Sequence, residues 1–289
     1  MKTIEIRRKA FALIGAAAAL AIGTAAAPLA AQSETPAVMT GPTYADLADL
    51  AIPAKLVIKA KIRKQATLKP ERAPSLRPGW ARLYIEAQTL SLISGDVPIG
   101  ESLKYLVDVR LDADGDVPKL KNREVLLFAL PVPGRPAELQ LVDVDAQLPA
   151  DPQTEARTTA ILRELASPDA PPRIEGVRDV LSVGGNLAGE SETQLFLDAA
   201  GGATVAISVV RRPGMEPKWG VSWTEIVDQS AEPPARDTLE WYRLACFLPD
   251  ALPQEAFLSN DRESRVRAEE DYRVVIEQLG SCPRTRGAS

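Results

Sequence analysis

Apolar and polar residues alternate with a period of two between positions 56 and 63. The apolar set is Leu56, Ile58, Ala60 and Ile62, and the side chains between them include the basic residues Lys59, Lys61 and Arg63. This period is typical of a half-buried β-strand. We interpret the basic residues as the solvated face of that strand, with a ligand-facing stripe as the alternative.

Four more segments before residue 145 have strand-like patterns. Alternation continues over residues 80–93 and 102–111, residues 123–130 contain a continuous apolar run, and Leu139 and Leu141 share one face of a fifth segment. Five short strands in about 90 residues predict a small antiparallel barrel or sandwich, and an OB-like barrel is the first shape we expect. Such a shape carries no function by itself.

A helix should follow this first β-rich region. Asp151 is suited to the N-cap and Pro152 to the first helical position, and the apolar side is Ile161, Leu162 and Leu165. The prolines of the run at 168–172 end the helix and favour an extended connector. We therefore predict one domain over 54–167 and a second over 173–282, with residues 283–289 as a tail.

The second region also reads as mainly β. Residues 193–210 predict two strands joined through Gly201 and Gly202, a hairpin signal. After the loop "RRPGMEPK", the alternation of Trp219, Val221 and Trp223 predicts another strand. The expected fold class is thus α+β and mainly β, with two antiparallel β domains, a linking helix and a C-terminal helix.

Two helices are expected near the end of the chain. Asp237 is the expected cap of the first, whose buried side is Leu239, Tyr242 and Cys246. The second begins with a capping-box pattern of Asn260 and Glu263 and ends at Gly280, and its apolar stripe is Ala268, Tyr272, Val275 and Leu279. This helix brings Cys282 within reach of Cys246, and we predict a disulfide between the two, with two buried thiols as the alternative.

The first 31 residues have the pattern of a bacterial signal peptide: a basic start, an apolar stretch and small residues before Gln32. We predict export to the periplasm with cleavage near Ala31. The alternative is an uncleaved anchor, the one case in which a membrane is an expected partner. Residues 32–53 are rich in Ala, Thr and Pro, and we expect most of them to form a mobile lead.

The ratio of basic to acidic residues limits the kinds of partner that the chain can bind. The whole chain has 34 Lys and Arg against 39 Asp and Glu. Without residues 1–31, which hold four basic residues and one acidic residue, the acidic excess grows to eight. Because nucleic-acid binding depends on neutralising phosphates, we do not expect a nucleic-acid partner; an envelope protein or a small ligand is expected instead.

The chain contains no histidine. This excludes Ser-His-Asp and Cys-His catalysis and the usual zinc and non-haem iron ligand sets. No nucleotide-binding glycine motif occurs either, so no cofactor is predicted. Paired carboxylates remain open to an enzyme, but the sequence singles out no pair.

The stretch "LDADGDV" raises the question of a calcium loop. An EF-hand counted from Asp112 needs Gly at its sixth position and Glu at its twelfth, and these positions hold Val117 and Arg123. Asp and Gly between two strand-like runs are ordinary turn residues. We predict a hairpin-like connection between strands and no metal site, with a weak surface cation site as the alternative.

Two resemblances complete the sequence-based picture. "LSVGGNLAGESETQLFL" resembles part of the cyclophilins, without the Arg-containing strand that precedes it in that family. "GESETQLFL", "RRPG" and "DTLEWYRLACFLP" resemble a family of uncharacterised exported proteins of alphaproteobacteria over most of the mature chain. The first implies a foldase as an alternative function, and the second implies no activity.

The region around "RRPGMEPKW" is the best candidate for a binding site. Arg211, Arg212 and Trp219 belong to the residue types that dominate recognition surfaces, and Arg binds anionic groups bidentately. A tryptophan that simply fills the core is the alternative. We therefore expect an exported envelope protein with a binding or scaffolding role, and a histidine-free enzyme as the other possibility.

Overall fold

The computed structural model describes residues 41–224 and 232–286. They form two antiparallel sheets, so the fold is mainly β with four α-helices in the described residues, one of them C-terminal, as expected. The predicted signal peptide, residues 32–40 of the predicted lead and the end of the tail lie outside the described residues. No helix within the described ranges is long and apolar enough to span a bilayer.

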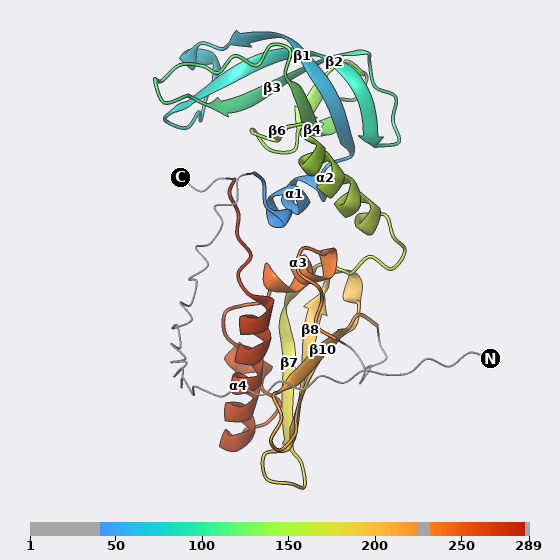
Figure 1. Ribbon diagram of the computed structural model, residues 1–289, viewed down its shortest axis with the longest axis vertical. Coiled ribbons are helices and arrows are strands. Elements are labelled where there is room, and N and C mark those ends of the chain that lie inside the picture. The colour runs from blue at the N-terminus through green and yellow to red at the C-terminus, as the bar shows by residue number, and fades with distance from the viewer. Residues whose placement is uncertain (1–40, 225–231, 287–289) are drawn as a thin grey trace, which may run out of the picture. The chain divides into compact units, whose positions relative to one another are not determined.

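The first sheet has the order β3-β2-β1-β4-β5, and β6 also pairs with β4 (Figure 1). The five predicted strands are present. Their bounds, with those of the sixth, are β1 Leu56–Thr67, β2 Trp80–Ser94, β3 Ser102–Arg110, β4 Glu124–Pro131, β5 Leu139–Leu141 and β6 Gln147–Pro149.

Backbone bonds also join the two edges of this sheet. Lys104 on β3 forms a parallel bridge with Glu138 beside β5, and its N–H donates to the carbonyl of Ala137 at 2.8 Å. Asp108 likewise donates to the carbonyl of Val144 at 2.7 Å. The sheet is thus curled on itself, as a barrel requires; the OB-like identity stays a prediction.

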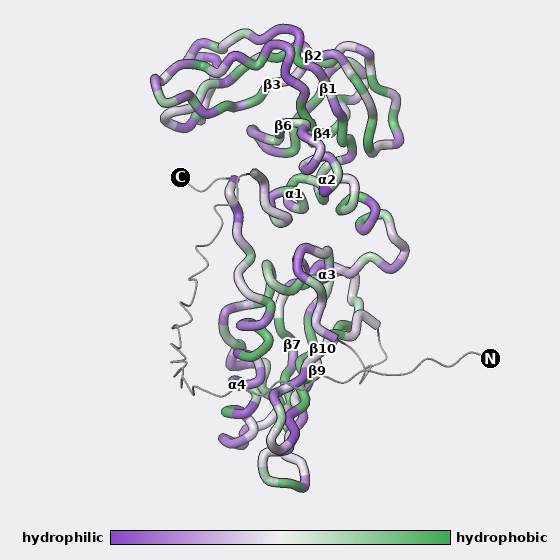
Figure 2. The backbone as a smooth tube through the Cα atoms, in the orientation of Figure 1, coloured by the Kyte–Doolittle hydropathy of each residue, from purple (hydrophilic) through white to green (hydrophobic). Residues whose placement is uncertain are grey.

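The sequence pattern explains which side of the sheet is buried. Every predicted apolar position of β1 from Leu56 to Ile62 is fully buried, and the continuous apolar run of β4 is buried from Val125 to Ala129. In Figure 2, hydrophobic and hydrophilic residues alternate along the strands. The period of two in the sequence therefore correctly predicted which side chains of β1 point into the core.

The connection from β3 to β4 contains the "DADGD" turn but is not a hairpin. β3 pairs with β2 and β4 pairs with β1, so the segment passes from one strand to a non-adjacent one. Asp112 Oδ1 accepts the backbone N–H groups of Asp114 and Asp116 at 3.1 and 2.8 Å, and Gly115 has φ +82°. The prediction of a strand-connecting turn is confirmed, and its hairpin-like character was wrong.

A helix lies within the predicted lead. Residues Tyr44–Ala51 form α1, whose first turn is closed by a capping box of Thr43 and Asp46, and most of its side chains are buried. Order therefore begins earlier than the strand pattern indicated. α2, Pro152–Leu165, has Asp151 as its N-cap, as predicted, and buries Ile161. A short 3-10 helix, η1, covers Pro70–Arg72.

The second sheet has the order β10-β9-β8-β7. Its strands are β7 Ile174–Gly184, β8 Ser191–Ala199, β9 Val205–Arg211 and β10 Lys218–Ser222. The predicted glycine turn between β8 and β9 is confirmed and includes the 3-10 helix η2, Ala200–Gly202. β7 was not predicted. Trp219 and Val221 share the predicted buried face, whereas Trp223 follows the end of β10 and is half-buried; the last residues predicted for that strand, 225–227, lie outside the described ranges.

One face of the second sheet is covered by α4, Arg262–Leu279, which lies along it in Figure 1. The predicted stripe from Ala268 to Leu279 is buried, and Gly280, with φ +68°, ends the helix as predicted. The N-cap is Asp261 and not Asn260, because the Asp261 carboxylate accepts the N–H of Ser264 at 2.8 Å. A carboxylate at that end also gains from the helix dipole.

α3, Leu239–Ala245, begins one residue later than predicted. Asp237 has φ +59°, a left-handed conformation that Asp tolerates, and Thr238 caps the helix instead. A 3-10 helix, η3, covers Gln254–Ala256. The predicted disulfide between Cys246, at the end of α3, and Cys282, beyond α4, is present.

The residues after Cys282 run to α1. Arg284 pairs with Asp49, Thr285 binds Asp46, and Arg286 pairs with Asp143 and Asp145 near β5. Buried side chains of both sheets belong to one continuous cluster. The proposed boundary at residues 168–172 stays a prediction.

Candidate binding groove beside β9 and β10

The predicted binding residues lie on the β9–β10 hairpin. β9 ends at Arg211, and the loop turns through Gly214, where the N–H of Met215 donates to the carbonyl of Arg212 at 3.1 Å. β10 then runs back with Lys218 opposite Val210 and Trp219 opposite Val209. The hairpin is therefore held by ordinary strand pairing on both sides of the loop.

Arg211 points toward α4. Its Nε donates to Asp271 Oδ1 at 2.5 Å, and the hydroxyl of Thr193 donates to the other oxygen of the same carboxylate. Asp271 is fully buried, and the Arg211 side chain is 29% exposed. The chief partner of Arg211 is thus an internal carboxylate.

Arg212 points the other way. Successive side chains near a strand end lie on opposite faces, so Arg212 borders the face that α4 does not cover. The structure therefore separates the two arginines that the sequence suggested as one anion-binding pair. Arg212 alone remains near the proposed ligand.

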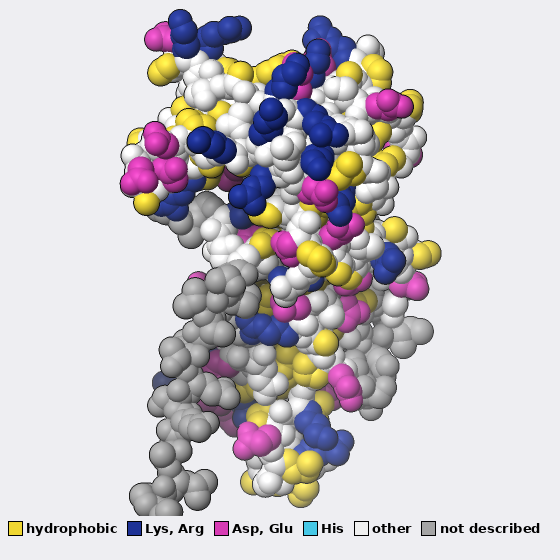
Figure 3. Space-filling view, turned by 45° about the horizontal axis from the view of Figure 1, so that its top comes forward, with side chains coloured by type: hydrophobic (Ala, Val, Ile, Leu, Met, Phe, Trp, Pro, Cys, Tyr) yellow, Lys and Arg dark blue, Asp and Glu magenta, His cyan; other side chains and the backbone are white. Residues whose placement is uncertain are grey.

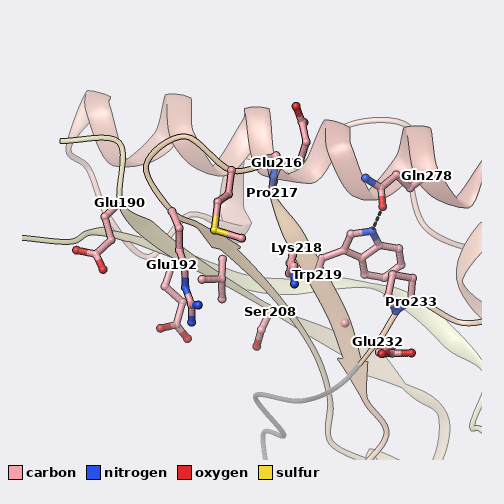
Figure 4. A pocket seen from close by; sticks show the side chains of 14 residues that line it. Glu190, Glu192, Ser208, Glu216, Pro217, Lys218, Trp219, Glu232, Pro233 and Gln278 are labelled. Atoms are coloured by element: carbon pink, nitrogen blue, oxygen red, sulfur yellow. Dashed lines mark hydrogen bonds between the residues drawn. The ribbon is translucent and has the colours of Figure 1, made fainter. Parts of the chain in front are cut away.

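A groove of about 710 Å³ lies on this uncovered face. Its floor follows the cross-strand row of Glu192, Val210 and Lys218, and Arg212 and Met215 lie at the loop end. Figure 4 labels Glu192, Ser208 and Lys218 among the lining side chains. Ser208 and Gly220 continue the floor with little or no side chain. The small residues leave room for a ligand between the longer ones.

Trp219 belongs to the core and borders the groove. It is 4% exposed, and its Nε1 donates to Gln278 Oε1 of α4 at 2.8 Å, the bond drawn in Figure 4. Its ring therefore fixes β10 against α4. Its use as an anchor for a ligand stays a prediction.

Both signs of charge line the groove. Glu190, Glu192, Glu216 and Glu232 provide carboxylates, and Arg212 and Lys218 provide cations. Glu190 accepts the N–H groups of Asn186 and Leu187 at 3.1 and 3.3 Å and so holds its own loop. Within the described residues, neither Arg212 nor Lys218 forms a salt bridge.

Sequence reasoning did not identify Glu192 or Glu232. Glu192 could have been found from the alternation along β8. Thr193 and Leu195 are buried on one face of this strand, and Glu192 and Gln194 point to the other face. Glu232 has no comparable signal, because it lies outside any strand or helix.

No group of three or more acidic or cysteine side chains suited to a metal occurs in the described part of the chain. A scan with protein-family models and a search of curated proteins found no match to the chain.

Proposed function

We propose that this chain is an exported cell-envelope protein that binds an extended peptide segment of another envelope protein in the groove beside β9 and β10. The observation that carries the proposal is the pair Arg212 and Lys218, which lines a groove of about 710 Å³ without any salt bridge to a described carboxylate. Charged groups with unused bonding capacity in a concave site are suited to a ligand.

The lining favours a peptide over a single small anion. The groove offers cations and carboxylates together, so it suits a ligand that carries both signs, as a polypeptide segment does. Met215 is 55% exposed at the loop end, and its flexible thioether adapts to apolar side chains of different shapes. The groove thereby combines polar selectivity with an adaptable apolar contact.

The proposed location rests on two features. The pattern of residues 1–31 is that of an export signal, and the Cys246–Cys282 disulfide indicates an oxidising compartment. The periplasm meets both conditions. The expected family resemblance to exported alphaproteobacterial proteins agrees with this location and adds no activity.

The experiment uses site-specific photo-crosslinking in the native envelope. A photoreactive amino acid at Met215 should capture one partner protein, and the crosslinked segment should be identified by mass spectrometry. A synthetic peptide of that segment should bind the purified full chain in calorimetric titration. The variant Arg212→Ala/Lys218→Ala should lose both the captured partner and the peptide affinity.

The matched control is Arg262→Ala/Arg273→Ala. Both of these side chains are exposed on α4, and neither forms a salt bridge with a described residue, so the control removes the same charge elsewhere. Capture that is unchanged in the groove variant, at equal stability, would refute the proposal.

A further inference from the structure

The outward face of β1, β2 and β3 carries a row of charges across the strands. Lys64 lies opposite Glu86, and Glu86 lies opposite Lys104. Lys64 Nζ is 2.9 Å from Glu86 Oε2, while Lys104 forms no salt bridge with any described residue. One carboxylate thus lies between two exposed cations. Glu138, the bridge neighbour of Lys104 on its other side, is bonded to Arg135.

The charge states of this row follow from its geometry. The hydrogen bond and the charge of Lys64, aided by the charge of Lys104, hold the pKa of Glu86 below its usual value. The hydrogen bond with Glu86 correspondingly raises the pKa of Lys64. Both shifts favour the charged forms of Glu86 and Lys64 at neutral pH.

More cations lie beside this row. Arg63 is the extra residue of a bulge in β1 and donates to Gln88 Oε1 from Nε at 3.1 Å. The next segment bonds to β1 through the N–H of Ile62 and the carbonyl of Arg123 at 3.0 Å, and Arg123 there borders the 112–116 turn. Both arginine side chains are exposed and lack salt bridges to the described residues. Figure 3 shows Lys and Arg side chains gathered over the first sheet.

An apolar and aromatic strip adjoins the charges on the same face. Tyr84 on β2 lies opposite Leu106 on β3, next to the row of Glu86 and Lys104. Leu106 is 47% exposed, and the Tyr84 ring is half-buried. Further along β2, the Arg77 guanidinium stacks 3.7 Å from the ring centroid of Trp80. The face therefore offers ring surface as well as charge.

The acidic residues of this region are placed elsewhere or are already bonded. Asp108 is buried and accepts two hydrogen bonds from Arg82, at 2.6 and 2.9 Å. Three other aspartates lie in the 112–116 turn. Residues 55–145 hold fifteen Lys and Arg against twelve Asp and Glu, whereas residues 146–289 hold fifteen against twenty-three. The basic excess is thus local to the first sheet of an acidic protein.

We propose that this face, which we call the basic face and define by Arg63, Lys64, Tyr84 and Lys104, binds a linear anionic polysaccharide. Carboxylate or phosphate groups spaced along a sugar chain would contact the unpaired cations. The apolar side of a sugar ring would pack on Tyr84, because aromatic rings offer a large rigid surface at little entropic cost.

A sugar polymer is favoured over other polyanions by two observations. The Cys246–Cys282 disulfide indicates an oxidising compartment, and the acidic excess of the whole chain disfavours a nucleic-acid partner. Tyr84 with Leu106 adds a contact that an acidic polypeptide does not require. The basic face is on the first sheet, so this proposal does not depend on the groove of the second.

The test measures binding of fluorescein-labelled polygalacturonate oligomers to the purified mature chain by fluorescence anisotropy. We expect saturable binding that weakens by roughly tenfold or more between 50 and 200 mM salt. Arg63→Ala/Lys104→Ala should weaken binding about tenfold at low salt, because two unpaired cations are lost. The α4 control Arg262→Ala/Arg273→Ala, with the same net charge, should stay within about twofold.

A second pair of measurements separates sugar recognition from general attraction to anions. Tyr84→Ser should weaken binding of polygalacturonate and leave binding of polyglutamate unchanged, while Tyr84→Phe should behave as the parent; thermal unfolding checks that each variant is folded. The proposal is overturned by equal or tighter binding of polyglutamate, of single-stranded DNA or of phosphatidylglycerol vesicles. Equal losses in the basic-face and α4 variants, or no binding of polygalacturonate, would overturn it as well.

Discussion

Asp46 and Thr285 are bonded to each other although 239 residues separate them. The backbone N–H and the hydroxyl of Thr285 donate to Asp46 Oδ2 at 3.0 and 2.7 Å, and Arg286 N–H donates to Oδ1 at 3.1 Å. Thr43 donates to the same carboxylate from within the capping box of α1. One buried carboxylate thus joins the start of the described chain to its end.

We predict that Asp46→Asn destabilises the protein by about 1–3 kcal/mol, because an amide nitrogen would face donors that now meet Oδ2. Urea unfolding of the purified chain measures this loss. Thr285→Ser, which keeps the hydroxyl, is the control and should stay close to the parent. A parental midpoint for Asp46→Asn would contradict the role of the carboxylate.

The same carboxylate predicts acid sensitivity. Burial alone would raise the pKa of Asp46, but the hydrogen bonds from Thr285, Thr43 and Arg286 outweigh it and hold the pKa below its usual value. Because the pKa of Asp46 is lower in the folded state, its contribution to stability is complete above the unfolded pKa of about 3.9. That contribution is lost as the pH falls through the folded-state pKa. The stability difference between parent and Asp46→Asn should therefore shrink below about pH 4, measured by urea unfolding at each pH.

Arg211 and Arg212 should differ sharply in their effect on stability. Arg211→Ala leaves the fully buried Asp271 without its cation, and we expect a loss of about 3–5 kcal/mol. Arg212→Ala should change stability by less than about 0.5 kcal/mol. Thermal and urea unfolding compare the two. Arg211→Ala/Asp271→Leu should recover part of the loss, since no buried charge then remains; equal effects of the two single variants would show that the internal pair is not formed.

The disulfide should contribute to stability through the loop that it closes. Cys246 and Cys282 are 36 residues apart, for which the chain-entropy model gives about 3–4 kcal/mol. Cys246→Ser/Cys282→Ser should show that loss, and hydrogen exchange at residues 281–286 should become faster. Adding reductant should destabilise the parent to the level of the double variant and leave the double variant unchanged. Free thiols in protein purified from the periplasm would contradict the prediction.

Calcium should not bind the 112–116 turn tightly. Asp112 Oδ1 already accepts two backbone N–H groups, which is the work of a turn residue. Calorimetric titration with calcium should show no site with a dissociation constant below about 1 mM, which is at the weak end of the range for protein calcium sites. Asp112→Ala should still cost about 1 kcal/mol by removing those acceptors. A micromolar site that Asp114→Asn abolishes would contradict this assignment.

The sequence predicted those strands in which the apolar alternation, or a continuous apolar run, extends over several residues. In β1, Leu56, Ile58, Ala60 and Ile62 are buried as their alternation indicated. The sequence did not predict β7, because its register with β8 shifts twice. The shifts lie between Ile174 and Gly176 and between Val177 and Asp179. Each bulge moves the next apolar residue by one position, so Ile174, Val177 and Val180 are buried without a period of two.

The sequence around α1 contains helix signals, but the segment is short. Its richness in Ala, Thr and Pro therefore indicated a mobile lead instead. Thr43 stands three residues before Asp46, which is a capping-box spacing, yet the helix has only eight residues. Its stability comes from packing, since helices of that length are marginal in isolation. The tail residues that bind it are 239 residues away, and no pattern in a single sequence indicates such a partner.

The groove residues were predicted only in part, because the partner that separates Arg211 from Arg212 is also distant in sequence. Arg212 and Trp219 were identified by residue type and nearness in sequence, and both border the groove. Arg211 has the same residue type but lies on the opposite face, where Asp271 of α4 binds it. The alternation of a strand distinguishes the two arginines, but the buried partner became visible only in the fold.

The bond between Asp46 and Thr285 also sets an order of assembly. A growing chain exposes residues 44–51 long before residues 284–286 have been synthesised, so during that interval Asp46 has only the donors of Thr43. Contacts of such long sequence separation also carry a large loop-closure entropy, which slows their formation. Residues 284–286 therefore complete the contacts of α1, and a carboxypeptidase that removed them would return residues 44–51 to their unfinished state.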